Sequence, residues 1–158
     1  MAELRGRGRL YLIAPVILLL IPLIYLAATY LMPSRPDISI EGQRAVLSKM
    51  FENSASIFMR ITNLGGEDYL SSARTDMPGT IIELHDMVDG KMTKVEGIRV
   101  PAKDTIELRP AKFHIMVFKI PEGFKGGSEF TLYLDFKLSG ERPIKVRLTD
   151  SFERQEGR

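Results

Sequence analysis

Two patterns of apolar positions divide the chain. From Leu10 to Met32, 23 consecutive residues carry no formal charge. As an α-helix this run would reach roughly 35 Å, which exceeds a bilayer hydrocarbon core of about 30 Å. Beyond it, short apolar or alternating stretches are separated by turn residues, with no long helical periodicity. The pattern predicts one N-terminal transmembrane helix at residues 10–32, followed by an all-β domain.

The residues that flank the apolar run indicate its orientation. Arg5, Arg7 and Arg9 precede it, and a basic flank predicts that residues 1–9 are cytoplasmic. The C-terminal domain is then extracytoplasmic, on the periplasmic or cell-surface side. A cleaved signal peptide is the alternative, but the run is longer than a signal core and ends in a poor small-x-small cleavage site. We therefore expect an uncleaved, single-pass membrane anchor.

The β-domain is predicted at residues 37–150, between a linker at 33–36 and a polar tail at 151–158. Pro33 and Pro36 disfavour continuation of the helix through the linker. The tail contains neither His nor Met and is expected to add no ligand. The spacing of turn residues favours a Greek-key β-sandwich over a barrel.

Ten stretches of the domain have the pattern of strands. In the most regular one, Phe130, Leu132, Leu134 and Phe136 fall on one face, which we predict to be core. The predicted strands are residues 37–41, 44–48, 56–62, 69–73, 80–85, 92–95, 105–108, 113–118, 129–136 and 144–148.

Composition narrows the chemistry of this domain. The chain has no cysteine, which excludes disulfides, thiolate zinc sites, a cysteine-ligated blue-copper centre and a lipidated cysteine. The net charge is only +2, so nothing favours nucleic-acid binding. Without a cysteine nucleophile or a phosphate-binding glycine loop, no enzymatic activity is predicted.

The two histidines of the chain are each followed by a methionine two positions later. These pairs are His85 with Met87 and His114 with Met116, and Met92 lies between them. Neutral imidazole nitrogen and thioether sulfur together suit monovalent copper better than zinc, magnesium or calcium. The plainer interpretation is that the methionines fill the core and the histidines form ordinary hydrogen bonds. The pairing of both histidines with methionine favours a Cu(I) site.

The predicted strands place these donors close together. His114 and Met116 point to the same face of one strand because strand side chains alternate. Met92 follows the predicted turn at Asp89-Gly90, so a hairpin brings it near His85. Glu83 shares a strand face with His85, where it is either an acceptor that orients the imidazole or a solvated carboxylate.

The stretches 83–92, 95–110 and 113–116 resemble the PCuAC family of periplasmic copper(I) chaperones. The motif of that family is His, ten residues, Met, 21 residues, His-x-Met. Met92, His114 and Met116 match its second half in full, but only six residues separate His85 from Met92. The resemblance implies a cupredoxin-like β-sandwich that binds Cu(I) through His85, Met92, His114 and Met116, with Met87 as the alternative to Met92.

The resemblance also implies a function. It predicts a membrane-anchored metallochaperone that delivers Cu(I) to a membrane copper enzyme, such as the CuA centre of cytochrome c oxidase. The partners expected are a haem-copper oxidase subunit or its assembly factors. The alternative is a resident accessory or structural subunit of a membrane complex that uses a PCuAC-like domain.

Overall fold

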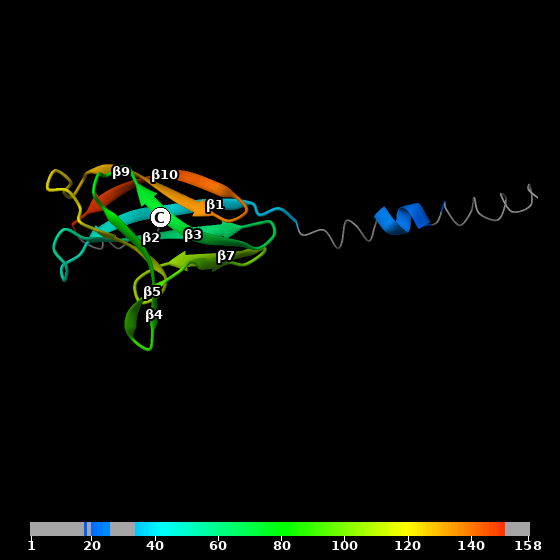
Figure 1. Cartoon of the computed structure of the whole chain (residues 1–158), viewed down its shortest axis with the longest axis horizontal. Helices are drawn as coiled ribbons and strands as arrows, with labels where there is room; N and C mark the ends of the chain where they lie inside the picture. The colour runs from blue at the N-terminus through cyan, green and yellow to red at the C-terminus, as the bar shows by residue number, and fades with distance from the viewer. Residues whose placement is uncertain (1–17, 19, 26–33, 151–158) are drawn as a thin grey trace, which may run out of the picture. The chain divides into compact units, whose positions relative to one another are not determined.

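The computed structural model describes residues 18, 20–25 and 34–150, which fall into two units, Met1–Ser34 and Arg35–Arg158 (Figure 1). In the first unit, the described residues 18 and 20–25 are helical. Within the described part of the chain, no helix is both long and apolar enough to cross a membrane. Most of the predicted span at 10–32, the basic residues 1–9 and the tail 151–158 lie outside the described residues, so the anchor stays a prediction.

The described residues of the second unit form ten strands, which confirms the all-β prediction. The strands are β1 (Ile38–Leu47), β2 (Ala55–Asn63), β3 (Asp68–Thr75), β4 (Ile81–Val88), β5 (Lys91–Val95), β6 (Ile98–Val100), β7 (Asp104–Leu108), β8 (His114–Phe118), β9 (Glu129–Phe136) and β10 (Gly140–Thr149). The short strand β6 was not predicted.

The strands follow the order β5-β4-β8-β2-β1-β10-β9-β3-β6, and β7 also pairs with β2. The parallel pairing of β1 with β10 joins a half that contains β4, β8 and β2 to a half that contains β9 and β3. Contacts of β3 with β4 and of β6 with β7 bring the far ends of the sheet together. The result is a sandwich that is almost closed into a barrel (Figure 1).

The core lies between these two halves. Phe130, Leu132, Leu134 and Phe136 of β9 are all buried in it, as their alternation predicts. Ile57 of β2 belongs to the same cluster, from the other half of the sandwich. Burial of these side chains is the main stabilising contribution, at about 1.5 to 3 kcal/mol for each large aliphatic or aromatic residue.

One strand was wrongly predicted as two. The predicted strands 37–41 and 44–48 are separated at the Gly42-Gln43 position, whereas β1 runs through it. The register with β2 shifts between Glu41 and Arg44, and Gly42 has a φ of 64°, which glycine adopts without strain. The glycine therefore marks a bulge within a continuous strand and not the end of a strand.

The β4–β5 hairpin turns at the predicted Asp89-Gly90 position. Both residues have positive φ, 51° and 74°, as a two-residue type I′ turn requires. This turn fixes the register so that Met87 lies opposite Met92. The hairpin tip extends from the body of the sandwich (Figure 1).

Candidate metal centre

The predicted donors lie on the outward face of β4, β5 and β8, in three successive cross-strand rows. In the central row, Lys94, His85 and His114 are aligned across β5, β4 and β8. Successive rows on one face are about 7 Å apart. The strands therefore bring together two histidines that are far apart in the sequence.

The flanking rows carry the sulfur donors. On one side of the histidines, Glu83 of β4 lies opposite Met116 of β8. On the other side, Met87 of β4 lies opposite Met92 of β5. Met92 was predicted to lie near His85 through the hairpin. In the structure, Lys94 is directly opposite His85, so Met92 lies diagonally across from His85, one row further along the hairpin.

The two imidazole rings are neighbours. Their centroids are 5.8 Å apart, and the ring planes are tilted by 50°. Only 8% of His85 and 4% of His114 is exposed to solvent. Buried polar side chains normally have all their hydrogen-bonding groups satisfied, so the partners of each ring nitrogen are informative.

The Nε2 atom of His85 lies 2.9 Å from Oε2 of Glu83. An ionised carboxylate only accepts hydrogen bonds, so Nε2 carries the proton and donates it. In the neutral ring, the other nitrogen, Nδ1, is then left with a lone pair. It is buried and has no hydrogen-bond partner in the described part of the chain. Glu83 therefore orients the imidazole, which is the first of the two roles predicted for it.

His114 is oriented in the same way by the backbone. Its Nδ1 atom lies 2.7 Å from the carbonyl oxygen of Lys112. Because a carbonyl only accepts, Nδ1 donates and Nε2 holds the lone pair. Lys112 belongs to the loop at residues 109–113 between β7 and β8. This loop is closed by a hydrogen bond from the Arg109 N–H to the Phe113 carbonyl, 2.8 Å away. Both histidines are thus held as tautomers with one nitrogen ready to bind a ligand.

Lys94 and His85 determine the charge state of Glu83. A hydrogen bond from Nζ of Lys94, 2.8 Å from Oε1, is the largest cause that lowers the pKa of Glu83. The hydrogen bond with His85 is the second cause. The lowered pKa keeps Glu83 ionised and therefore able to accept from the imidazole.

The three methionines differ in their exposure. Met116 is 1% exposed, and its sulfur accepts a hydrogen bond from the Ser56 hydroxyl at 3.1 Å. Met87 is half-buried, and Met92 is 43% exposed. In the described part of the chain, no group of three or more His, Asp or Glu side chains could hold a metal ion. Besides Glu83, the rows that flank the histidine pair offer methionine sulfur, which is a soft donor.

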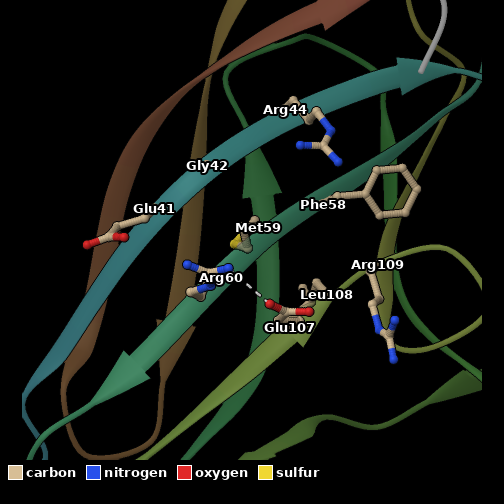
Figure 2. Close-up of a pocket in the computed structure, with 9 residues that line it drawn as sticks. All are labelled: Glu41, Gly42, Arg44, Phe58, Met59, Arg60, Glu107, Leu108 and Arg109. Carbon is tan, nitrogen blue, oxygen red and sulfur yellow. Dashed lines mark hydrogen bonds and ion pairs between the residues drawn. The ribbon is translucent and has the colours of Figure 1, made fainter. Parts of the chain in front are cut away.

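Figure 2 shows a cavity lined by residues of β1, β2 and β7 and by Arg109. Phe58 lies between this cavity and the histidine pair. Its ring is placed between Arg44 and Arg109 in Figure 2, and its centroid is 6.4 Å from that of His114. The cavity has a volume of about 220 Å³ and is lined by Glu41, Gly42, Arg44, Phe58, Met59, Arg60, Glu107, Leu108 and Arg109. None of the predicted donors lines it, so it is a neighbour of the candidate centre and not part of it.

Sequence reasoning missed three groups that shape the centre. The Ser56 hydroxyl, the Lys112 carbonyl and the Lys94 ammonium each contact a donor or its orienting carboxylate. Lys94 could have been found from the hairpin, because the type I′ turn alone places it opposite His85. Nothing in the sequence pattern of β2 signals the contact of Ser56 with Met116, which depends on the pairing of β2 with β8.

Several known proteins share this fold. The PCuAC domain of PmoF1, in its apo form, has a TM-score of 0.64 at 19% identity, covering 74% of this chain and 97% of that domain. The copper-bound PCuAC domain of PmoF2 has a TM-score of 0.62 at 18% identity, covering 76% and 100%. The Cu(I) form of DR1885 from Deinococcus radiodurans has a TM-score of 0.59 at 18% identity, covering 71% and 78%. The chain therefore has a PCuAC-like fold, as the resemblance implied.

Sequence comparison identifies the family. A protein of Leifsonia xyli subsp. xyli named "Putative lipoprotein Lxx21020" is 23% identical over 132 residues, which is 80% of each chain. The family model described as "Putative lipoprotein LpqE-like" matches residues 38–148, which is nearly the whole β-domain. The chain belongs to the LpqE-like family.

Proposed function

We propose that the β-domain is a Cu(I) metallochaperone domain and that it performs no catalysis. The proposed ligands are His85, His114 and Met116, with a fourth donor from the β4–β5 hairpin. The motif spacing makes Met92 that donor, and Met87 is the alternative. In this proposal, the domain at residues 37–150 is a cupredoxin-like Greek-key sandwich.

One observation carries the proposal. Two buried imidazoles lie side by side, and each has one nitrogen engaged by an acceptor, so that in the neutral ring the other nitrogen holds the lone pair. The lone pair of His85 Nδ1 is buried without a partner in the described part of the chain. A buried polar atom of this kind costs about 1 to 3 kcal/mol unless something binds it. The adjacent row supplies the sulfur of Met116, which selects for a soft cation.

The comparisons support the identity of the metal. Two of the structurally similar domains are named as copper-bound or Cu(I) forms. Cu(I) bound by two imidazoles and two thioethers would keep its single positive charge, since all four ligands are neutral. Thioethers are also not lost to disulfide formation in an oxidising compartment. Such a site allows exchange with an incoming ligand, which suits a protein that collects copper and passes it on.

Membrane attachment completes the proposed role. The family and its relative are named as lipoproteins, yet this chain has no cysteine to carry a lipid. The uncharged run at residues 10–32 would serve instead as a single-pass anchor, with the β-domain on the extracytoplasmic side. Tethering would raise the effective concentration of the domain near a membrane copper enzyme, such as the CuA centre of a haem-copper oxidase.

The test of delivery is direct transfer. The full chain, loaded with one equivalent of Cu(I), is mixed under anaerobic conditions with the apo CuA domain of an oxidase subunit, and copper on each protein is measured after separation. We expect copper to move to the acceptor in proportion to the loaded chain. A loaded chain that keeps its copper while the acceptor remains empty would contradict a carrier role and favour a resident subunit.

A further inference from the structure

Met87 and Met92 of the β4–β5 hairpin form a pair beside the histidines. Met87 and Met92 are directly opposite each other on β4 and β5, fixed by the tight turn at Asp89-Gly90. Directly opposed side chains have Cβ atoms about 4.5 to 5.5 Å apart, a separation that two thioethers can bridge with one metal ion. Both side chains share the outward face with His85.

Exposure rises steadily across the donors. Met116 and the two histidines are buried, Met87 is half-buried, and Met92 is 43% exposed. Met87 is nearer to the histidine pair than Met92, because β4 lies between β5 and β8. The donors therefore form a continuous path on one face, from the solvent at Met92 through Met87 to the buried imidazoles.

We infer that Met87 and Met92 act as a thioether relay through which Cu(I) enters and leaves the buried site at His85, His114 and Met116. This inference rests on the proposed function and resolves which hairpin methionine serves as the fourth donor, because both do so in turn. Each step is a ligand exchange. During uptake, a bond from Cu(I) to a donor of the partner breaks as the bond to the Met92 sulfur forms, and a second partner donor leaves as the Met87 sulfur binds. The remaining partner donors are then replaced by His85, His114 and Met116. Copper remains Cu(I) throughout, and release follows the same steps in reverse.

The relay separates equilibrium affinity from exchange rate. With Met87→Leu or Met92→Leu, the remaining hairpin sulfur still serves as the fourth donor, so affinity changes little. The path is interrupted in both variants, and exchange should slow about tenfold, equivalent to about 1.4 kcal/mol in the barrier. The double variant should lose affinity as well, since no hairpin sulfur remains.

The experiment compares the full chain with these three variants and with Met50→Leu, which removes an exposed methionine outside the three rows. Cu(I) affinity is measured by competition with a chromophoric chelator, and the rate of copper removal by stopped flow with excess chelator. The expected result is slow exchange with nearly unchanged affinity in both single variants and normal behaviour of Met50→Leu.

Two other results overturn the relay. Exchange rates of both single variants equal to that of the unmodified chain would mean that copper does not pass through the pair. A loss of affinity for Met92→Leu as large as that for a histidine variant would make Met92 a fixed ligand. Either result leaves Cu(I) binding by the unmodified chain intact, whereas absence of that binding would overturn the proposed function together with the relay.

Discussion

The buried polar side chains of Asp68 and His85 lie in different regions of the domain, and their hydrogen-bonding groups are satisfied very differently. At the start of β3, both oxygens of Asp68 accept hydrogen bonds, from the backbone N–H groups of Tyr69, Leu138 and Ser139 and from the Ser139 hydroxyl, at 2.6 to 2.9 Å. At the histidine rows, the buried Nδ1 of His85 has no partner in the described part of the chain. Both carboxylate oxygens of Asp68 are thus satisfied, and this region supports the fold. Among the described residues, the second region retains a buried imidazole nitrogen without a partner, which a ligand could engage.

The largest effect on Cu(I) affinity is expected when two of the proposed donors are removed. The double variant His114→Ala and Met116→Leu should lower Cu(I) affinity by more than about a hundredfold, because it deletes two of the proposed ligands. The fold should survive, because Met116→Leu keeps the apolar volume and His114 lies outside the hydrophobic core cluster. Competition titration measures the affinity and circular dichroism the fold. Retained tight binding with intact structure would show that the ligands lie elsewhere.

A smaller loss is expected when the orientation of one ligand is removed. Glu83→Ala deletes the acceptor that holds His85 with its Nδ1 lone pair free, and loss of such a partner costs about tenfold to a hundredfold in metal affinity. Glu83→Gln, which keeps an acceptor oxygen, should retain more of the affinity. The matched control is Glu129→Ala, which removes an exposed ion pair with Arg147 in the other half of the sandwich. Equal affinities for all three variants would mean that the Glu83 contact plays no part in binding.

The opposite outcome is expected at Asp68. Asp68→Asn places an amide donor against several N–H donors, and each buried group left unsatisfied costs about 1 to 3 kcal/mol in the free energy of unfolding. Copper affinity should not change. Chemical denaturation measures the stability, with the exposed Asp135→Asn on β9 as the control. A variant that loses copper affinity but not stability would reverse the roles assigned to the two regions.

A smaller change is expected when acid alters the difference in free energy of unfolding between the unmodified chain and Asp68→Asn. Burial alone would raise the pKa of Asp68, but hydrogen bonds from Ser139, Tyr69 and Leu138 together lower it below its ordinary value of 3.8. A carboxyl whose pKa is lower in the folded state stabilises the fold above its unfolded pKa. This contribution is lost as the pH falls through the folded pKa. The stability difference between the unmodified chain and Asp68→Asn should therefore be constant near neutral pH and shrink below about pH 4, as denaturation at several pH values would measure.

Much of the local structure could be predicted from the sequence. The alternation at 129–136 identified core residues, the Asp89-Gly90 pair identified the hairpin, and the His-x-Met spacing placed two donors on one strand face. Each of these depends on neighbours in the sequence. Side-chain alternation and turn conformation are determined over a few residues, so they can be read without the fold.

What could not be predicted depends on contacts between distant segments. The alignment of His85 with His114 and the contact of Ser56 with Met116 follow from the pairing of β8 with β4 and β2. Register between such strands is determined by packing of the whole sheet and not by local pattern. The parallel pairing of β1 with β10, and the bulge at Gly42, were missed for the same reason.

The two histidines and the neighbouring methionines are the proposed mixed nitrogen and sulfur site for Cu(I). The most direct test is X-ray absorption spectroscopy of the full chain loaded with one equivalent of Cu(I) under anaerobic conditions. We expect one tightly bound copper with two nitrogen neighbours from His85 and His114 and sulfur neighbours that include Met116. A chain that binds no Cu(I), or copper surrounded only by nitrogen and oxygen, would contradict it.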